Sequence, residues 1–346
     1  MRMSNSLDEP RTAQLLQMIK GFWISQIVGT LARLKIADRL AQGPLDCDVL
    51  AARIECNPES TFRLLRASIH VGLIAALPDG RFGLTPLGEL LRSDVRGSLR
   101  NLAVAHTAHG CWAPWGRLTE AVRSGERQAI ATLGYELFDY YAAHPSEGHA
   151  FTDAMGDLSA VIAHVVASVV DTSAVRHAID IGGASGMIVA ALLQKNPGMR
   201  GTILERTEVV PSARMALAER GLSKRCEVVA GDFFKHVPEA DLFILKHVLH
   251  DWSDEQSVTI LRNCASALHP KGRIILIEWL LQEKAGPGPA ALSDLNMLVL
   301  LPGRERSAAQ LVQLLRAAAL RLERITEIAS SLYVLEASPA VTNAPT

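Results

Sequence analysis

The run KHVLHDW (residues 246–252) places two histidines and an aspartate close together. An imidazole with a pKa near 6.5 is mostly neutral at pH 7, so it can accept a proton from a substrate hydroxyl. That help matters because a phenol with a pKa of about 10 costs roughly 4 kcal/mol to ionise at pH 7. We therefore predict that one of the two histidines, His247 or His250, is a general base.

Two glutamates further along the chain are candidates to support that base. Glu278 stands at the end of a predicted strand, and Glu305 lies in the segment PGRERS (302–307). A carboxylate beside an imidazole fixes its tautomer and stabilises its protonated form. The histidines and Asp251 also look like metal ligands, but no third clear ligand lies near them in the sequence, so we predict no metal.

The elements that must position these residues follow the pattern of a nucleotide-binding fold. Helical segments alternate with short apolar strands, which we predict at 178–181, 201–204, 227–229, 241–245 and 273–278. Such alternation implies parallel strands with right-handed crossovers and a ligand across their carboxyl ends. A glycine-rich turn, GGASG (182–186), follows the first strand. A turn at 269–272 precedes the fifth strand, and paired strands at 321–326 and 332–337 close the sheet.

The residues at the strand ends indicate which nucleotide binds. The glycine turn lacks the G-x-G-x-x-G spacing of dinucleotide sites, and no phosphate-binding lysine follows it. Glu205 ends the second strand, and Asp232 and Phe233 follow the third. Carboxylates accept hydrogen bonds from ribose hydroxyls and from an adenine amino group, while Phe233 can stack on the adenine ring. S-adenosylmethionine fits this set, because its sulfonium cation also suits acidic surroundings.

The composition argues against several classes of protein. The 346 residues suffice for two domains, and a net charge of -1 predicts no general attraction to nucleic acid or membranes. Five widely spaced cysteines without a C-x-x-C pair fit a reducing cytoplasm, not a disulfide framework or a zinc site. The longest strongly apolar stretch, 158–170, includes His164 and is too short to span a bilayer. We expect a cytoplasmic protein without a signal peptide or membrane span.

The first hundred residues predict a helical module with a winged helix-turn-helix. Apolar residues recur at helical spacing from Leu15 to Leu40, and helices at 49–54 and 58–71 precede a hairpin at 73–84. This pattern is typical of DNA-binding proteins, but acidic residues offset its arginines, and phosphate contact needs excess positive charge. The apolar load of the leading helices favours dimerisation instead. We predict a dimerisation domain at 1–100, a helical linker at 101–175 that contributes to the substrate pocket, and a cofactor-binding catalytic domain at 176–340.

Together the motifs resemble the class I S-adenosylmethionine-dependent O-methyltransferases, in particular the caffeate-type plant enzymes and bacterial enzymes that act on antibiotic and pigment precursors. The resemblance covers almost the whole chain and is carried by AIDIGGASG (178–186), AGDFF (230–234), LKHVLHDWSDE (245–255), LIEWLL (276–281), DLNMLVLLPGRERS (294–307) and FTDAMGDLS (151–159). It implies a Rossmann-like sheet, parallel with an antiparallel closing strand, and an N-terminal winged-helix domain that forms a homodimer. S-adenosylhomocysteine would be the product of the cofactor.

The resemblance also implies roles for individual residues. His250 would be the general base, with Glu278 and Glu305 flanking it. The residues implied to contact the cofactor are Gly182, Gly183, Glu205, Asp232, Phe233 and Lys246. Those implied to contact a planar aromatic acceptor, of the phenolic polyketide or hydroxyphenazine type, are Phe151, Met155, Asp251, Asn296 and Met297.

Two alternatives remain at this point. Some relatives keep the cofactor but have lost methyl transfer, so the same fold could carry out decarboxylation or hydroxylation. A winged-helix protein could instead be a ligand-responsive DNA-binding regulator. The sequence leaves open the acceptor, the methylated position and whether nitrogen is also methylated. His247 stands where plant relatives carry tryptophan, which favours a different acceptor.

Overall fold

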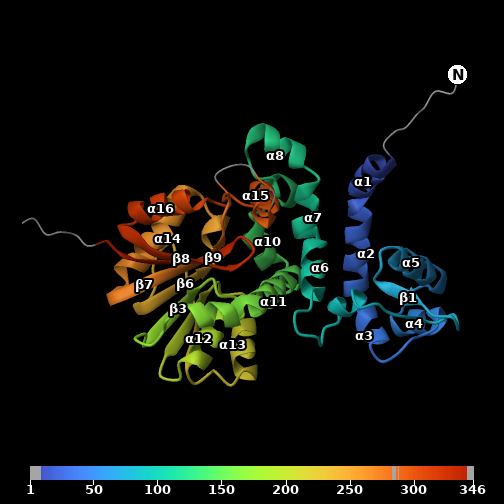
Figure 1. Cartoon of the computed structure of the whole chain (residues 1–346), viewed down its shortest axis with the longest axis horizontal. Coiled ribbons are helices and arrows are strands. Elements are labelled where there is room, and N and C mark those ends of the chain that lie inside the picture. Colours follow the sequence, from blue (N-terminus) through green and yellow to red (C-terminus); the bar gives the residue numbers. More distant parts are fainter. Residues whose placement is uncertain (1–8, 283–285, 287, 341–346) are drawn as a thin grey trace, which may run out of the picture. The chain divides into compact units, whose positions relative to one another are not determined.

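The computed structural model describes residues 9–282, 286 and 288–340. The chain divides into two compact units, of which the first ends at Ala108 and the second begins at His109 (Figure 1). The limits predicted for a separate helical linker stay a prediction.

The first unit is mostly helical and contains the predicted hairpin. Its elements are α1 (Glu9–Ile19), α2 (Gly21–Arg33), α3 (Ile36–Leu40), α4 (Cys47–Arg53), α5 (Pro58–His70), β1 (Ile74–Ala76), β2 (Phe82–Leu84), the 3-10 turn η1 (Gly88–Leu91) and α6 (Arg100–His106). The start of α5 follows from local sequence, because the Asn57 side chain accepts a hydrogen bond from the Ser60 backbone N–H at 2.9 Å and Pro58 occupies the first turn.

The two leading helices expose a large apolar surface. Leu15, Met18, Phe22 and Trp23 are each more than half exposed. Exposed large apolar side chains gathered on two consecutive helices are typical of an interaction surface. It is the surface on which the predicted dimerisation depends.

The second unit is built on a seven-stranded sheet in the order β5-β4-β3-β6-β7-β9-β8. Its strands are β3 (His177–Ile181), β4 (Arg200–Glu205), β5 (Cys226–Ala230), β6 (Ala240–Lys246), β7 (Leu268–Trp279), β8 (Leu320–Ala329) and β9 (Leu332–Pro339). The pairs from β5 to β7 are parallel, and β9 is antiparallel to both of its neighbours. The strand order reverses at β3, and such folds bind ligands outside the carboxyl ends of the strands at that point.

Strand β7 begins earlier than the sequence predicted. Residues 269–272, predicted as a turn, belong to the strand. The pairing with β6 is irregular here, since Ala240 opposes Leu268 but Leu242 opposes Arg273. Pro270 and Gly272 therefore mark a bulge inside the strand and do not interrupt it. Lys271, between them, has a left-handed φ of 69°.

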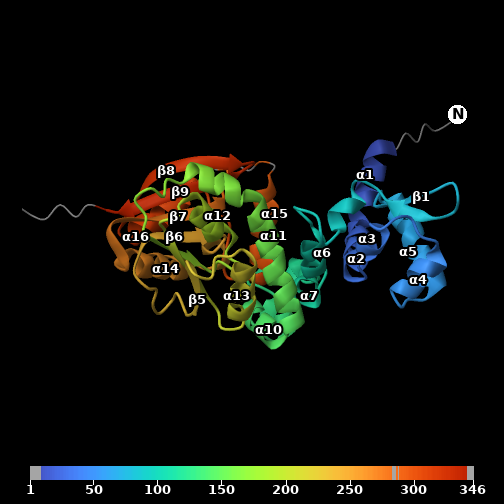
Figure 2. The same cartoon turned by 90° about the horizontal axis from the view of Figure 1, so that it is seen from below.

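Helices cover both faces of this sheet (Figures 1 and 2). One face packs against α11 (Pro145–Val169), α12 (Met187–Lys195) and α13 (Val210–Glu219), and the other against α14 (Asp254–Ser266) and α16 (Ala308–Ala317). Alternation along the strands explains the two cores: Ala178 faces the first set of helices, while Ile179 and Ile181 face the second.

Helix α11 corrects the length expected for the apolar stretch at 158–170. The helix has 25 residues and is long and apolar enough, by length and composition, to cross a membrane. The sequence estimate counted only its second half. Val166 and Ala167 on this helix are buried in the core that covers the sheet, so its apolar composition serves packing within the unit.

Five further helices form a third, smaller core in this unit. They are α7 (His109–Trp115), α8 (Leu118–Ser124), α9 (Ala129–Leu133), α10 (Leu137–Ala143) and α15 (Pro289–Leu300). Tyr140, Tyr141 and Met297 are buried in that core, and Phe138 and Phe151 pack against it. Aromatic side chains of the region predicted as a helical linker are thus used for packing.

Candidate active site

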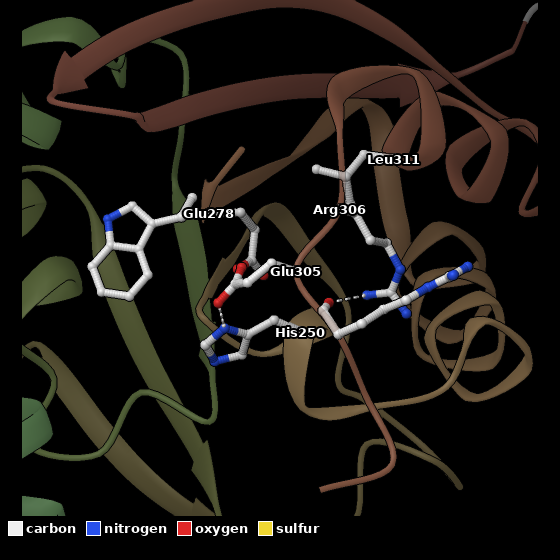
Figure 3. A pocket seen from close by; sticks show the side chains of 7 residues that line it. His250, Glu278, Glu305, Arg306 and Leu311 are labelled. Atoms are coloured by element: carbon white, nitrogen blue, oxygen red, sulfur yellow. Dashed lines mark hydrogen bonds and ion pairs between the residues drawn. The ribbon is translucent and has the colours of Figure 1, made fainter. Parts of the chain in front are cut away.

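Strand β6 delivers His250 to the carboxyl edge of the sheet. The 3-10 turn η2 (Leu249–Asp251) follows β6 directly, and Glu278 lies near the carboxyl end of the adjacent β7. Glu305 comes from the loop between α15 and α16. Figure 3 shows both carboxylates pointing toward the imidazole of His250. The structure therefore brings together the three residues predicted to be catalytic.

Carboxylates face both ring nitrogens of His250. Nδ1 lies 2.8 Å from Oε1 of Glu305, and Nε2 lies 3.3 Å from Oδ1 of Asp251. Oε1 of Glu278 accepts a hydrogen bond from the Leu249 backbone N–H at 3.2 Å, which holds the start of the turn. Only 12% of the His250 side chain is exposed. A neutral ring that keeps its proton on Nδ1 for Glu305 presents Nε2 as the acceptor of a substrate proton.

The protonation of His250 differs from the sequence prediction. Burial opposes the charged form, but Asp251 and Glu305 outweigh it and raise the pKa of His250 to about 9. The ring is therefore a cation at pH 7 when no ligand is bound, whereas a mostly neutral ring was expected. Burial in turn raises the pKa of Glu278 to about 7 and that of Asp251 to about 6.

His247 has the opposite behaviour although it stacks on His250. The two ring centroids are 5.0 Å apart, and the other neighbour of His247 is the Trp279 ring at 4.8 Å. Burial, Lys246 and His250 all lower the pKa of His247, so it stays neutral. Its backbone adopts a left-handed φ of 51°, and its Nε2 has no hydrogen-bond partner among the described residues. This assigns the basic role to His250.

The structure brings together one group of possible metal ligands that the sequence argument did not consider. His250, Glu278 and Glu305 each offer a ligand atom, and these atoms lie within 4.8 Å of one another. Three groups that could hold a metal ion therefore lie together, although Glu278 and Glu305 are distant from His250 in the sequence. Oε1 of Glu305, however, already accepts hydrogen bonds from His250 and from Ser293 Oγ at 2.6 Å.

The glycine turn adopts the conformation its sequence requires. Gly182, Ala184 and Gly186 have left-handed φ angles of 62°, 49° and 70°. A side chain at Gly186 would place its Cβ 2.3 Å from Cδ1 of Ile203, so this position has no room for one. Ala184 tolerates the conformation, and its backbone N–H donates to Oε1 of Glu205 at 2.7 Å.

The acidic residues at the strand ends fit a nucleoside that carries no phosphate. Glu205 accepts hydrogen bonds from the backbone N–H groups of Ala184 and Arg206, and each of its oxygens keeps a lone pair for a ribose hydroxyl. Asp232 accepts from the Phe234 backbone N–H at 3.0 Å. Phe233 packs edge-on against Trp252, with ring centroids 6.0 Å apart. The residues present therefore suit S-adenosylmethionine.

A buried aspartate beneath the glycine turn was missed by the sequence analysis. Asp180 on β3 is 2% exposed, and a Cβ at Gly183 would lie 2.5 Å from its Cγ. Burial raises the pKa of Asp180 to about 7 and lowers that of Lys246 to about 8. A charged residue in the middle of an apolar strand was the signal that could have found it.

Of the residues predicted to contact the acceptor, Phe151 and Met155 lie on α11, Asn296 and Met297 lie on α15, and Asp251 lies on η2. Phe151 stacks on Tyr141 at a centroid distance of 4.8 Å, and Met297 is only 5% exposed within the smaller core. Trp115 Nε1 donates to Asn296 Oδ1 at 2.9 Å. Ser293, one turn before Met297, donates to Glu305, so this face of α15 borders the base.

Three residues that hold the base were also missed. Ser293 and Asp294 bind the side chain and the backbone N–H of Glu305, and Arg306 binds the backbone of the turn that carries His250. No local sequence pattern predicts these contacts, because each depends on how distant elements pack. The nearest signal in the sequence was the arginine on each side of Glu305, Arg304 and Arg306.

Comparison with known proteins decides the family. Residues 115–321 match the model of an O-methyltransferase domain, and residues 16–94 match an O-methyltransferase dimerisation domain. The chain belongs to the O-methyltransferase family. It is thus a methyltransferase, and the dimerisation domain supports a homodimer. The comparisons do not favour the alternatives, which were decarboxylation, hydroxylation and DNA-binding regulation.

Several relatives resemble the chain over nearly its full length. A phenazine O-methyltransferase of Lysobacter antibioticus is 36% identical over 331 residues, which cover 95% of this chain and 97% of that protein. The structure of a mitomycin 7-O-methyltransferase is 34% identical with a TM-score of 0.90, covering 97% of this chain and 100% of that one.

The structure of human N-acetylserotonin methyltransferase contains S-adenosylmethionine. It is 28% identical to this chain with a TM-score of 0.88, and the match covers 99% of this chain and 100% of that one. These findings support S-adenosylmethionine as the cofactor and indicate no metal requirement.

Proposed function

We propose that this O-methyltransferase methylates a hydroxyl group on a planar aromatic secondary metabolite, of the phenolic polyketide or hydroxyphenazine type. The observation that carries the proposal is the imidazole of His250, which Glu305 holds at 2.8 Å in the turn after β6, the strand that pairs with β3. The names of the relatives, a phenazine and a mitomycin methyltransferase, support an aromatic acceptor. We place the enzyme in the cytoplasm as a homodimer without nucleic-acid or membrane partners.

In this proposal the cofactor supplies an electrophilic methyl carbon, and the protein supplies position and a base. Glu305 holds the proton on Nδ1 of His250, so that Nε2 receives the proton of the acceptor hydroxyl. Asp251 lies beside Nε2 and stabilises the imidazolium that results. Burial of this group keeps water away from the reacting oxygen.

The raised pKa of His250 suits a phenol. Proton transfer from a phenol of pKa about 10 to a base of pKa about 9 costs about 1.4 kcal/mol, compared with about 5 kcal/mol for a base near 6.5. The ring must first be neutral, and the positive charge of a bound sulfonium favours that neutral form.

The remaining contacts are proposals of the same kind. The cofactor is bound by Gly182, Gly183, Glu205, Asp232, Phe233 and Lys246. The acceptor is bound by Phe151, Met155, Asp251, Asn296 and Met297. Met297 then acts mainly as support, since it is nearly buried.

The proposal is tested by product analysis with S-adenosylmethionine that carries a deuterated methyl group. The purified protein is incubated with hydroxyphenazines, hydroxynaphthoates and catechols, and with their amino and methoxy analogues as matched controls. Mass spectrometry should find one labelled methyl group on the hydroxyarenes and none on the controls. Methylation of the amino analogues alone, or an unlabelled decarboxylated or hydroxylated product, contradicts it.

A further inference from the structure

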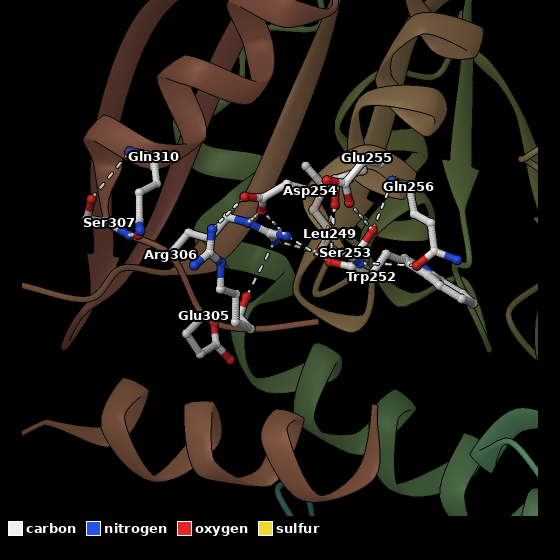
Figure 4. Close-up of polar contacts among 12 residues, drawn as sticks. Leu249, Trp252, Ser253, Asp254, Glu255, Gln256, Glu305, Arg306, Ser307 and Gln310 are labelled. Carbon is white, nitrogen blue, oxygen red and sulfur yellow. Dashed lines mark hydrogen bonds and ion pairs between the residues drawn. The ribbon is translucent and has the colours of Figure 1, made fainter. Parts of the chain in front are cut away.

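Arg306 is a buried arginine whose guanidinium faces the backbone of the catalytic turn. Its side chain is 2% exposed. Nη1 donates to the carbonyl of Leu249 at 2.7 Å, and Nη2 donates to the carbonyl of Trp252 at 2.7 Å. These two carbonyls lie on either side of His250 and Asp251 in the chain. Figure 4 shows Arg306 beside Leu249 and Trp252. One rigid cation thus spans the turn that carries the base.

The charge of Arg306 is balanced by Asp254 in the first turn of α14. Nε and Nη2 each lie 2.9 Å from Oδ1 of Asp254. Burial opposes ionisation of this aspartate, but Arg306 and Arg304 keep its pKa below the usual value. Arg304 binds the same carboxylate from a half-exposed position and makes no contact with the two turn carbonyls. The chain therefore offers two neighbouring arginines that share one counter-ion and differ in their contact with the turn.

Gly303 brings the backbone of the same segment against the turn. A Cβ at this position would lie 2.0 Å from the carbonyl oxygen of His250 and 2.5 Å from the backbone nitrogen of Trp252. Glu305, between Gly303 and Arg306, contacts the ring of His250 itself. The segment 303–306 therefore holds the base by close backbone packing, by a carboxylate on the ring and by a guanidinium on the turn.

The helices at both ends of this contact are fixed by their own caps. Ser253 and Gln256 form a capping box at the start of α14, directly after Trp252. Ser307 and Gln310 form another at the start of α16, directly after Arg306. Both boxes hold the helix ends in place without Arg306. The guanidinium thus ties two helix starts together across the turn.

We propose that Arg306 is a positioning residue that acts through His250: its guanidinium sets the direction of the imidazole, and Gly303 leaves the space for that contact. The inference rests on the proposed role of His250 as the base. Lysine cannot replace this arginine, because a single ammonium group cannot serve two separated carbonyls and Asp254 at once. Ser257 Oγ also lies 3.2 and 3.4 Å from the two carbonyls, so they keep a weaker donor when Arg306 is changed.

The test compares Arg306→Lys with Arg304→Lys in the full-length protein. Turnover is measured on a phenol of pKa near 10 and on an acidic phenol that is already ionised at the assay pH. Arg306→Lys should lower kcat on the first acceptor about 10- to 100-fold and change the second less than about threefold. Affinity for S-adenosylhomocysteine, measured by calorimetry, should stay within about threefold. Arg304→Lys should leave all three quantities nearly unchanged.

A double variant separates positioning from a general structural effect. If Arg306 acts through His250, adding Arg306→Lys to His250→Ala causes no further loss of kcat, because the base is already absent. Equal losses on both phenols, or a further loss in the double variant, overturn the inference. If His250→Ala itself spares the high-pKa phenol, the proposed base is wrong instead.

A second variant covers the case in which Arg306→Lys does not fold. Asp254→Asn keeps the guanidinium and removes the counter-charge that Arg306 shares with Arg304. It should lower kcat on the high-pKa phenol several-fold and spare the acidic phenol. Losses that are the same for both phenols in this variant also overturn the inference.

Discussion

The glycine turn and the base turn follow neighbouring strands, β3 and β6, but they are held in different ways. The carboxylates on the cofactor side bind backbone N–H groups nearby: Glu205 holds the glycine turn, and Asp232 caps its own loop. The base side is held from a distance, since Glu305 lies 55 residues after His250. The base is thus fixed before any ligand binds, whereas the cofactor carboxylates keep free lone pairs for a ligand. Substitutions on the base side should therefore lower turnover, and those on the cofactor side should lower the affinity for S-adenosylhomocysteine.

The largest effect should come from removing the base. His250→Ala should lower turnover of a high-pKa phenol about a hundredfold or more, because general-base catalysis typically contributes that much. Affinity for S-adenosylhomocysteine should stay within about threefold, since the ring is not among the groups proposed to bind the cofactor. Steady-state kinetics and calorimetry measure the two quantities.

The matched control for His250→Ala is His269→Ala. His269 pairs with Asp241 at the opposite edge of the sheet, where β6 and β7 begin. This variant should keep both turnover and affinity. Full activity of His250→Ala on a phenol of pKa near 10 would refute the base assignment.

The next effect should appear on the cofactor side. Glu205→Gln replaces an acceptor by an amide that must turn a donor toward the N–H of Ala184 or of Arg206. Hydrogen bonds to charged groups contribute about 1.5–3 kcal/mol, so the Kd for S-adenosylhomocysteine should rise about 10- to 100-fold. At saturating cofactor, turnover should fall much less.

Glu208→Gln is the control for this variant. Glu208 lies in the same loop and pairs with Arg206 near the surface, so the Kd should stay within about twofold. A Glu205→Gln variant with normal affinity but low turnover would erase the distinction between the two sides.

The same contrast explains what the sequence could predict. Glu205, Asp232 and the glycine turn sit within a few residues of a strand, and strand ends can be located from apolar runs and glycines. The role of Arg306 depends on how the loop after α15 packs on the turn after β6, which no local pattern encodes. The raised pKa of His250 likewise depends on Glu278 and Glu305, which join the adjacent Asp251 at the ring only in the folded chain. The buried Asp180, by contrast, could have been found, because a charged residue stands there in the middle of an apolar strand.

The pH dependence of the reaction should show the raised pKa. His250 acts in its neutral form, and a pKa of about 9 leaves about 1% of the ring neutral at pH 7. The value of kcat/KM for a neutral acceptor should therefore rise about tenfold per pH unit above 7, as long as the ring titrates. The plateau should begin below pH 9 at saturating cofactor, because the sulfonium lowers the pKa of the ring. A phenol that is already ionised should lose this rise, and a flat profile between pH 7 and 9 for a high-pKa phenol would contradict it.

The smallest effect should follow metal removal. His250, Glu278 and Glu305 could together satisfy a cation, yet His250 and Ser293 already donate hydrogen bonds to one carboxylate oxygen of Glu305. A metal ion would have to displace the proton on Nδ1, and the base would then lose the tautomer that the carboxylate enforces. Dialysis against a chelator should therefore change turnover less than about twofold. Added zinc should, if anything, inhibit, and a loss of activity that zinc or magnesium restores would show that the three side chains form a metal centre and not a base with its support.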